Sequence, residues 1–268
     1  MDKSFTVGIT NQGEPGLDFD WIDRLNAVKF AVVISKAANE KFEDILLKNR
    51  DKIIYHAVCT GLAGTKIEPN VPTVTEKFMH LKRLIDFGFP PSQIVVRVDP
   101  LFPLQWVPVM NRVLEIDYLQ KLKNILVMTE NLGIKRVRYS YVNLYDFVLS
   151  KLQLISHEFL IQMPWQPVYH REIQLDKMNR NLEYESCAEY YVPLHHQIPC
   201  ISEKDLKILK LDSRNELTYD NKIEKNNPAC NCPSNKMEIM SNNNFKCEYD
   251  CKYCYWKSVK IDYARQVK

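Results

Sequence analysis

The sequence is poor in glycine, with only 7 in 268 residues. It contains neither the G-x-G-x-x-G pattern of dinucleotide-binding folds nor a Walker-type phosphate loop, and both motifs need glycine where the backbone approaches phosphate. The common glycine-rich nucleotide sites are therefore excluded. A strong excess of one charge is also lacking, because 36 Lys and Arg against 33 Asp and Glu give a formal net charge of +3. A charge this small does not by itself predict a nucleic-acid partner.

Long hydrophobic runs are missing as well. No apolar stretch approaches the roughly 20 residues of a membrane-spanning helix, and the first residues lack the apolar segment of a secretory signal. We therefore expect no membrane partner and a cytoplasmic protein. The 8 cysteines are too sparse and too uneven for a disulfide scaffold, so reduced thiols are expected.

What the sequence does contain is an alternation of strand-like and helix-like segments. Apolar runs rich in β-branched residues occur at 5–9, 30–36, 53–60, 94–100 and 136–141, with weaker ones at 159–163 and 182–187. Helical spacing of apolar residues predicts helices at 18–27, 42–49, 78–85 and 116–132. Thr73 or Thr75 is the expected cap of the third helix. This alternation predicts an α/β fold, a partial or complete (β/α) TIM-like barrel over residues 1–213.

Residues 214–268 differ in composition and carry a cysteine motif. The segment 214–244 is rich in Asn, Lys, Glu and Ser and predicts a solvated linker. After it, Cys247, Cys251 and Cys254 form a Cys-x3-Cys-x2-Cys motif. Thiolates select zinc or iron–sulfur clusters, and three ligands are one short of the set that closes an ordinary site. We therefore predict a C-terminal iron–sulfur arm with one iron open to an outside ligand.

Other interpretations of the cysteine motif remain open. Cys230 or Cys232 could supply a fourth ligand to a zinc site. Either could also close an iron–sulfur cluster, which would give a non-catalytic module for electron transfer or nucleic-acid interaction. Under both interpretations the site would be structural and would leave no metal position open for a small molecule.

Polar residues lie where the predicted strands end, which is where β/α barrels carry their chemistry. Arg97 and Asp99 alternate with valines and so share one face of a strand. Such a pair can orient a carboxylate or ribose or can be a structural salt bridge, and the sequence leaves both open. The catalytic candidates are Arg97, Asp99 and Glu68. The cofactor-binding candidates are Lys36, Thr60, Tyr139, Tyr141 and Glu189.

Several of these residues also support a family resemblance. The cysteine motif, with Tyr253 before its last cysteine, resembles the cluster motif of radical S-adenosylmethionine (SAM) enzymes. Its C-terminal position, with Cys230-x-Cys232 upstream, resembles the family called domain of unknown function 1848. The other similar segments are 67–72, 96–100, 187–189 and 200–202. The segments 9–13, 34–38 and 248–250 depart from the family pattern and leave the substrate unassigned.

The resemblance implies a function and its cofactors. It implies a 4Fe-4S cluster on the three C-terminal cysteines, SAM on the open iron, and a reducing partner of the flavodoxin or ferredoxin type. Spore photoproduct lyase has a similar cysteine motif, which implies nucleic acid or a nucleotide as substrate. Cys187 and Cys200 match family positions and, with Cys230 and Cys232, are candidates for a second metal or cluster site.

Overall fold

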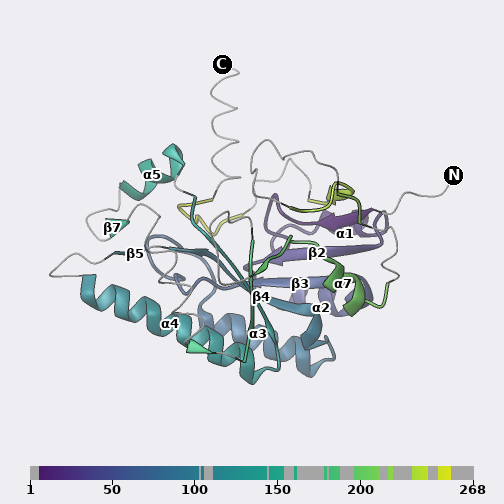
Figure 1. Ribbon diagram of the computed structural model, residues 1–268, viewed down its shortest axis with the longest axis horizontal. Coiled ribbons are helices and arrows are strands. Elements are labelled where there is room, and N and C mark those ends of the chain that lie inside the picture. Colours follow the sequence, from purple (N-terminus) through teal and green to yellow (C-terminus); the bar gives the residue numbers. More distant parts are fainter. Residues whose placement is uncertain are drawn as a thin grey trace, which may run out of the picture.

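The computed structural model has an eight-stranded sheet at its centre (Figure 1). It describes residues 6–102, 104–105, 111–143, 145–153, 160–161, 178–179, 181–187, 196–211, 217–219, 231–240 and 247–254. The strands of the sheet are β1 Val7–Ile9, β2 Phe30–Ser35, β3 Ile53–Val58, β4 Ile94–Leu101, β6 Arg136–Tyr141, β8 Glu183–Ser186, β9 His196–Gln197 and β10 Lys236–Glu238. Every neighbouring pair is parallel. The predicted α/β class is confirmed, with a parallel sheet.

The strand order is β10-β1-β2-β3-β4-β6-β8-β9. It runs in one direction from β1 to β9, whereas a doubly wound sheet reverses direction at a switch point. The last strand, β10, lies beside the first, as in a barrel. Among the described strands no pairing joins β9 to β10. The arrangement is therefore compatible with a partial barrel.

Helices cover the sheet. They are α1 Trp21–Leu25, α2 Glu40–Lys48, α3 Val74–Asp86, α4 Asn111–Asn131, α5 Asp146–Gln153 and α7 Glu203–Ile208. Short 3-10 turns at Arg50–Lys52 and Pro91–Gln93 lead into β3 and β4. Figure 1 shows α2, α3 and α4 side by side along one side of the sheet. A separate ribbon pairs β5, Leu104–Gln105, with β7, Leu160–Ile161.

The two faces of the sheet are buried in different ways, because successive strand residues point to opposite faces. One face, which includes Val33, Tyr55 and Val96, packs against the apolar sides of the helices. The other face, which includes Val32 and Ile54, forms a smaller cluster with α7 through Leu206. Burial on both faces explains why these strands are near-continuous apolar runs.

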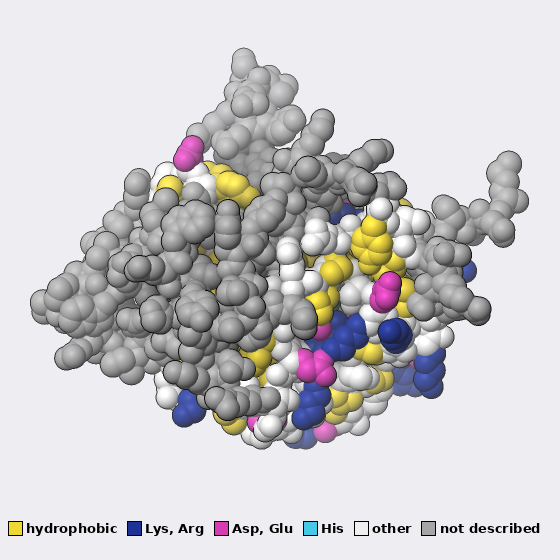
Figure 2. All heavy atoms as spheres, in the orientation of Figure 1, with side chains coloured by type: hydrophobic (Ala, Val, Ile, Leu, Met, Phe, Trp, Pro, Cys, Tyr) yellow, Lys and Arg dark blue, Asp and Glu magenta, His cyan; other side chains and the backbone are white. Residues whose placement is uncertain are grey.

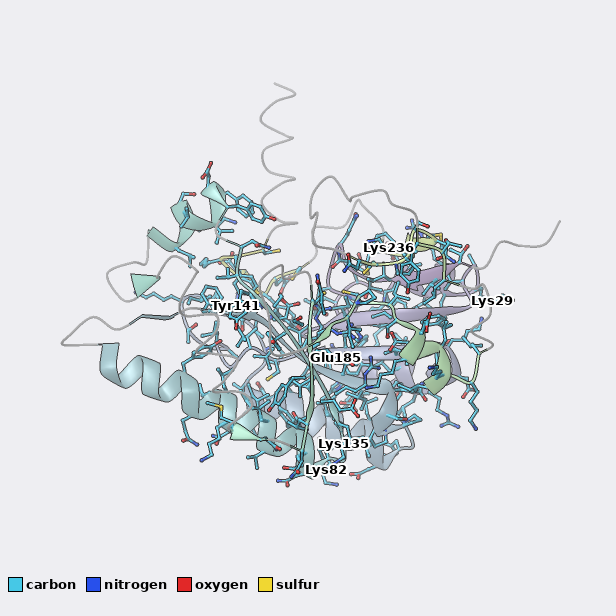
Figure 3. The ribbon with its side chains drawn as sticks, viewed as in Figure 1. Lys29, Lys82, Lys135, Tyr141, Glu185 and Lys236 are labelled. Carbon is cyan, nitrogen blue, oxygen red and sulfur yellow. The ribbon has the colours of Figure 1, made fainter. Side chains whose placement is uncertain are left out.

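A buried ion network completes the smaller face. Arg136 donates to Glu185 Oε1 at 3.2 Å and to Asp205 Oδ1 at 2.8 Å. Arg138 is also paired with Glu185 and donates to the carbonyl of Pro199 at 3.0 Å. Glu185 lies near the centre of the molecule (Figure 3). The network therefore joins β6, β8, α7 and the segment before α7.

Most predicted elements appear where the sequence places them, and several structured segments were not predicted. Thr73, rather than Thr75, caps α3 in a capping box with Glu76. β10 lies within the residues expected to form a linker, and no strand was predicted there. The short elements β5, β9, α5 and α7 were also not predicted. In the described part of the chain no helix is both long and apolar enough to cross a bilayer.

His80 of α3 is the most acid-sensitive group of the helix layer. It is fully buried, with Nδ1 2.9 Å from Glu43 Oε1 and Nε2 3.3 Å from the Tyr55 hydroxyl. Burial, helped by the nearby Lys77 charge, lowers the pKa of His80 to about 3. Burial opposes ionisation of Glu43, but the hydrogen bond from Arg83 outweighs it and lowers that pKa. Glu43 is thus charged and His80 neutral near pH 7.

This arrangement predicts acid destabilisation below pH 6.5. The unfolded chain binds a proton at His80 near pH 6.5, whereas the folded chain binds it only near pH 3. His80 should therefore contribute a fall in the free energy of unfolding of up to about 1.4 kcal/mol per pH unit as the pH is lowered through this window. Urea unfolding between about pH 7 and pH 4 measures this slope. His80→Gln should remove this contribution and leave those of His56, whose pKa is also lowered by burial, and of Glu238, whose pKa burial raises to about 7. Equal slopes for variant and wild type would contradict the assignment.

Candidate functional site

A cavity of about 330 Å³ opens at the carboxyl ends of the parallel strands. Three of its sides come from segments following β1, β2 and the β4–β6 pair, and its fourth side is the cysteine loop, residues 247–254. Its wall includes Glu14, Lys36, Asp99, Ser140, Tyr141, Tyr145, Cys247, Tyr249, Cys251, Tyr253 and Cys254. Figure 3 labels Tyr141 at the end of β6. The strand ends are where a β/α arrangement places its chemistry.

The three cysteines of the motif all face this cavity. Cys251 is buried, and Cys247 and Cys254 are half-buried. Burial raises the pKa of Cys251 to about 12, although Lys36 opposes the rise, and its neighbours Cys254 and Cys247 add to it. Such a thiol stays protonated until a bound metal displaces the proton.

The chemistry of the donor set suits zinc or an iron–sulfur cluster, because both take thiolate ligands. Within the described residues no three or more His, Cys, Asp or Glu side chains converge as they must around one metal ion. In a 4Fe-4S cluster each thiolate binds a different iron, so the sulfurs do not need to meet at one point. Thiolates are also the ordinary ligands of such clusters.

Glu68 connects the cysteine loop to the sheet. Its carboxylate is fully buried and accepts hydrogen bonds from Lys36 Nζ at 2.8 Å, from Thr60 Oγ1 at 2.5 Å and from the Tyr253 hydroxyl. Lys36 follows β2 and Thr60 follows β3, whereas Tyr253 belongs to the cysteine loop. Three residues predicted separately from the sequence, Lys36, Thr60 and Glu68, therefore form one cluster.

Backbone contacts support the same junction. The Lys252 amide donates to the carbonyl of Ile67 at 3.0 Å, and Asn70 Nδ2 donates to the carbonyl of Glu248 at 2.8 Å. The segment 67–70 therefore holds the cysteine loop on both sides of Cys251. The Tyr253 ring packs edge-on against Phe102, with centroids 5.5 Å apart.

The protonation states at this junction follow from burial and charge. Burial opposes the charge on Lys36, but Glu68 and Cys251 outweigh it and hold its pKa above the usual value. Burial, with the adjacent Glu68 charge, raises the pKa of Tyr253. Lys36 therefore remains an ammonium and Tyr253 a neutral phenol, and both donate to Glu68.

Asp99 and Arg97 both lie on β4, but only Asp99 lines the cavity. Asp99 lines the cavity and accepts a hydrogen bond from Ser140 Oγ. Arg97 is buried and donates to Asp99 from Nη2 and to Cys200 Sγ from Nη1, the latter at 3.3 Å. Asp99 can therefore contact a ligand, whereas Arg97 positions Asp99 from behind.

Of the other residues predicted to bind a cofactor, only Tyr141 is among the described residues that line the cavity besides Lys36. Tyr141 lines the cavity, but Tyr139 is fully buried and packs with the helix-covered face. Thr60 reaches the site only through Glu68. Glu189 and Cys230 lie outside the described residues.

Glu14 is the main site residue that the sequence reasoning missed. It lines the cavity in the loop after β1 and accepts hydrogen bonds from Ser35 Oγ and from the Lys36 amide, the latter at 2.9 Å. It thereby fixes the end of β2. The signal was partly present, since loops after barrel strands carry function, but this loop also contains Asp18 and Asp20, and the sequence does not single out Glu14 among the three.

Cys187, Cys200 and Cys232 form a second group, away from the cavity wall. The sulfurs of Cys187 and Cys200 are 3.4 Å apart, and the Cys200 amide is 3.3 Å from Cys232 Sγ. The hydrogen bond from Cys187, with Cys232, Arg97 and Arg138, lowers the pKa of Cys200 against the effect of burial. The structure thus brings together three of the four cysteines proposed for a second site.

Comparison with known proteins gives one family. A search of the curated proteins finds no match. A family model described as Domain of unknown function (DUF1848) matches residues 22–256. That range includes β2 to β10, both cysteine groups and the segment around Glu68. The chain therefore belongs to the DUF1848 family.

Proposed function

We propose that this protein is a radical SAM-type enzyme. In this proposal Cys247, Cys251 and Cys254 hold a 4Fe-4S cluster, and a flavodoxin- or ferredoxin-like protein supplies electrons. The supporting observation is that the three thiols face one cavity at the strand ends, with Asp99 and Lys36 on the same wall. When bound, a reduced cluster with SAM supplies the electron that cleaves SAM to methionine and a deoxyadenosyl radical.

The residues of the chain position the cysteine loop and line the cavity beside it. Tyr253 and Glu68 hold the cysteine loop over the strand ends. Tyr141, Tyr145 and Tyr249 give the cavity flat aromatic surfaces on which a ring can pack. Asp99 offers a carboxylate to an amino or hydroxyl group.

The cavity wall also bears on the class of substrate. Among its described residues Lys36 is the sole Lys or Arg, and it is paired with Glu68. Figure 2 shows Lys and Arg side chains interspersed with Asp and Glu on the described part of one face, rather than a basic surface. Nucleic-acid binding depends on cations facing phosphates. We therefore propose a neutral or amine-bearing substrate in place of a nucleic acid or nucleotide.

The alternative is a non-catalytic iron–sulfur or zinc module with Cys230 or Cys232 as fourth ligand. Cys232 contacts the Cys200 amide and is not part of the cavity wall. Closing the site with Cys232 would require this contact to break. No observation on the described residues favours the alternative.

The first test is anaerobic reconstitution with iron and sulfide. We expect brown protein whose paramagnetic resonance signal, after reduction, changes when SAM is added, and reduced samples should form 5′-deoxyadenosine. A paramagnetic resonance signal that does not change when SAM is added, together with no formation of 5′-deoxyadenosine, would overturn the enzyme proposal. Colourless protein with stoichiometric zinc would instead support the module.

A matched pair of cysteine variants tests the ligands. Cys251→Ser should lose the cluster because it removes one of the three thiols on the cavity wall. Cys59→Ser is the control, because Cys59 is also buried but does not line the cavity. Iron per chain is the measurement, and equal iron in both variants would contradict the assignment.

Removal of the Glu68 charge should destabilise the protein and the cysteine loop. Glu68→Gln leaves the buried Lys36 ammonium without its counter-charge, which costs about 3–5 kcal/mol for a buried pair. The control, Asp86→Asn, removes the exposed partner of Lys82 and should cost at most about 1 kcal/mol.

Urea unfolding and iron retention after gel filtration measure the two effects. Glu68→Gln should lower both, and Asp86→Asn neither. Equal stability of the two variants would show that the Glu68 junction does not hold the loop.

A further inference from the structure

The second cysteine group lies on the smaller face of the sheet, beside buried charge. Cys187 follows β8 and Cys200 precedes α7, and both are more than nine-tenths buried. Their sulfurs are 3.4 Å apart, while Arg97 Nη1 is 3.3 Å from Cys200 Sγ. A guanidinium directed at one sulfur of a close pair is an arrangement that favours thiolate reactivity.

We propose that Cys187 and Cys200 are a redox-active dithiol that hydroperoxides convert to a disulfide. The Cys200 thiolate attacks one oxygen of the peroxide and becomes a sulfenic acid as the O–O bond breaks, and the other oxygen leaves, after protonation, as water from hydrogen peroxide or as an alcohol from an alkyl hydroperoxide. The Cys187 thiol then attacks the sulfenic sulfur, forming the disulfide and releasing water. Two thiols are oxidised and one peroxide is reduced. This proposal is independent of whether the cysteine loop holds a cluster.

The surroundings of Cys200 suit this reaction. Arg97 Nη1 is also 3.4 Å from His56 Nδ1. Among the described side chains, Arg97 Nε and His56 Nε2 are buried without a hydrogen-bond partner. Both nitrogen atoms belong to the Arg97–His56 pair that adjoins Cys200, and they are available to donate hydrogen bonds to the oxygens of a small oxidant.

The geometry also favours one pair over the other combinations. A disulfide bond is about 2.0 Å long, so the Cys187 and Cys200 sulfurs need only a small side-chain rotation to bond. Cys232, which is half-buried, contacts the Cys200 backbone amide through its sulfur. Cys59, which faces the helix-covered core, has no such neighbour among the described cysteines.

The dithiol is linked to the cavity through Arg97. The same guanidinium that contacts Cys200 also binds Asp99, which lines the cavity. Disulfide formation removes the negative charge that Arg97 faces at Cys200. Arg97 is thus a positioning residue shared by the dithiol and by the candidate site.

The test uses the full-length chain in two forms, wild type and a variant with Cys247, Cys251 and Cys254 all changed to Ser. Each is treated anaerobically with hydrogen peroxide, alkylated, digested and examined by mass spectrometry. We expect a Cys187–Cys200 cross-linked peptide in both forms, with the loss of two alkylatable thiols in the triple variant. A dithiol reductant should restore them.

Single substitutions in the triple-variant background identify the pair. Cys187→Ser and Cys200→Ser should each abolish the cross-link, and Cys232→Ser should retain it. A Cys200–Cys232 link, or no loss of thiols, would overturn the proposal. Zinc or iron bound to the triple variant and shielding these thiols would overturn it too, because the group would then be a metal site.

Arg97 gives a kinetic test that a purely structural role would not satisfy. Arg97→Gln should slow peroxide-dependent thiol loss about tenfold, the equivalent of one charge-assisted hydrogen bond, and Arg97→Lys should recover part of the rate. A rate unchanged in Arg97→Gln would contradict the role of the guanidinium. Thermal unfolding of each variant is measured in parallel, and only variants that unfold cooperatively are compared.

Discussion

The buried Glu68 carboxylate is the interaction on which the candidate site depends. Lys36, Thr60 and Tyr253 all donate to it. These donors come from the ends of two strands and from a loop more than 180 residues further along the chain. A carboxylate removed from water is costly unless its lone pairs are satisfied, so the three donors must remain in place together. The cysteine loop is therefore positioned by an electrostatic requirement as well as by packing.

Arg97 makes a corresponding connection on the other side of the cavity. It spans from Asp99, on the cavity wall, to Cys200, within the smaller face of the sheet. Arg136, Arg138 and Glu185 continue the polar network toward α7. The molecule thus has two sulfur-containing regions, one facing the cavity and one behind it. A single guanidinium contacts the second and reaches the cavity wall through Asp99.

The parts of the fold that were predictable are those where one pattern dominates. The run 30–36 is nearly continuous in apolar residues and the run 94–100 is rich in valine, and they appear as β2 and β4. β10, Lys236–Glu238, has no β-branched residue, and its pairing with β1 reflects the available sheet edge rather than local propensity. Short elements such as β9 and α7 carry too few residues for a periodic signal.

The sequence predicted where along the chain the site residues lie, but it did not predict which of them contact one another. The rule that strand ends carry chemistry identified Lys36, Asp99 and Tyr141, all of which line the cavity. It also selected Tyr139, which shares a strand face with Tyr141 but lies deeper and is fully buried, and the sequence does not show how far along a strand the cavity reaches. The grouping of Cys232 with Cys200 was expected from the family resemblance, whereas spacing alone left Cys232 equally free to join the cysteine loop, and the contact with the Cys200 amide distinguishes the two.

The pairing of β10 with β1 has a consequence for biosynthesis. β1 has β2 on one side and β10 on the other, so a nascent chain that has emerged only as far as β9 leaves one side of its first strand without hydrogen-bond partners. Open strand edges are templates for association with other chains, and partly made proteins are vulnerable in this way. Protection of that edge and delivery of the cysteine loop depend on the same late stretch of polypeptide, so the ribosome must add both before the nascent molecule is safe from aggregation.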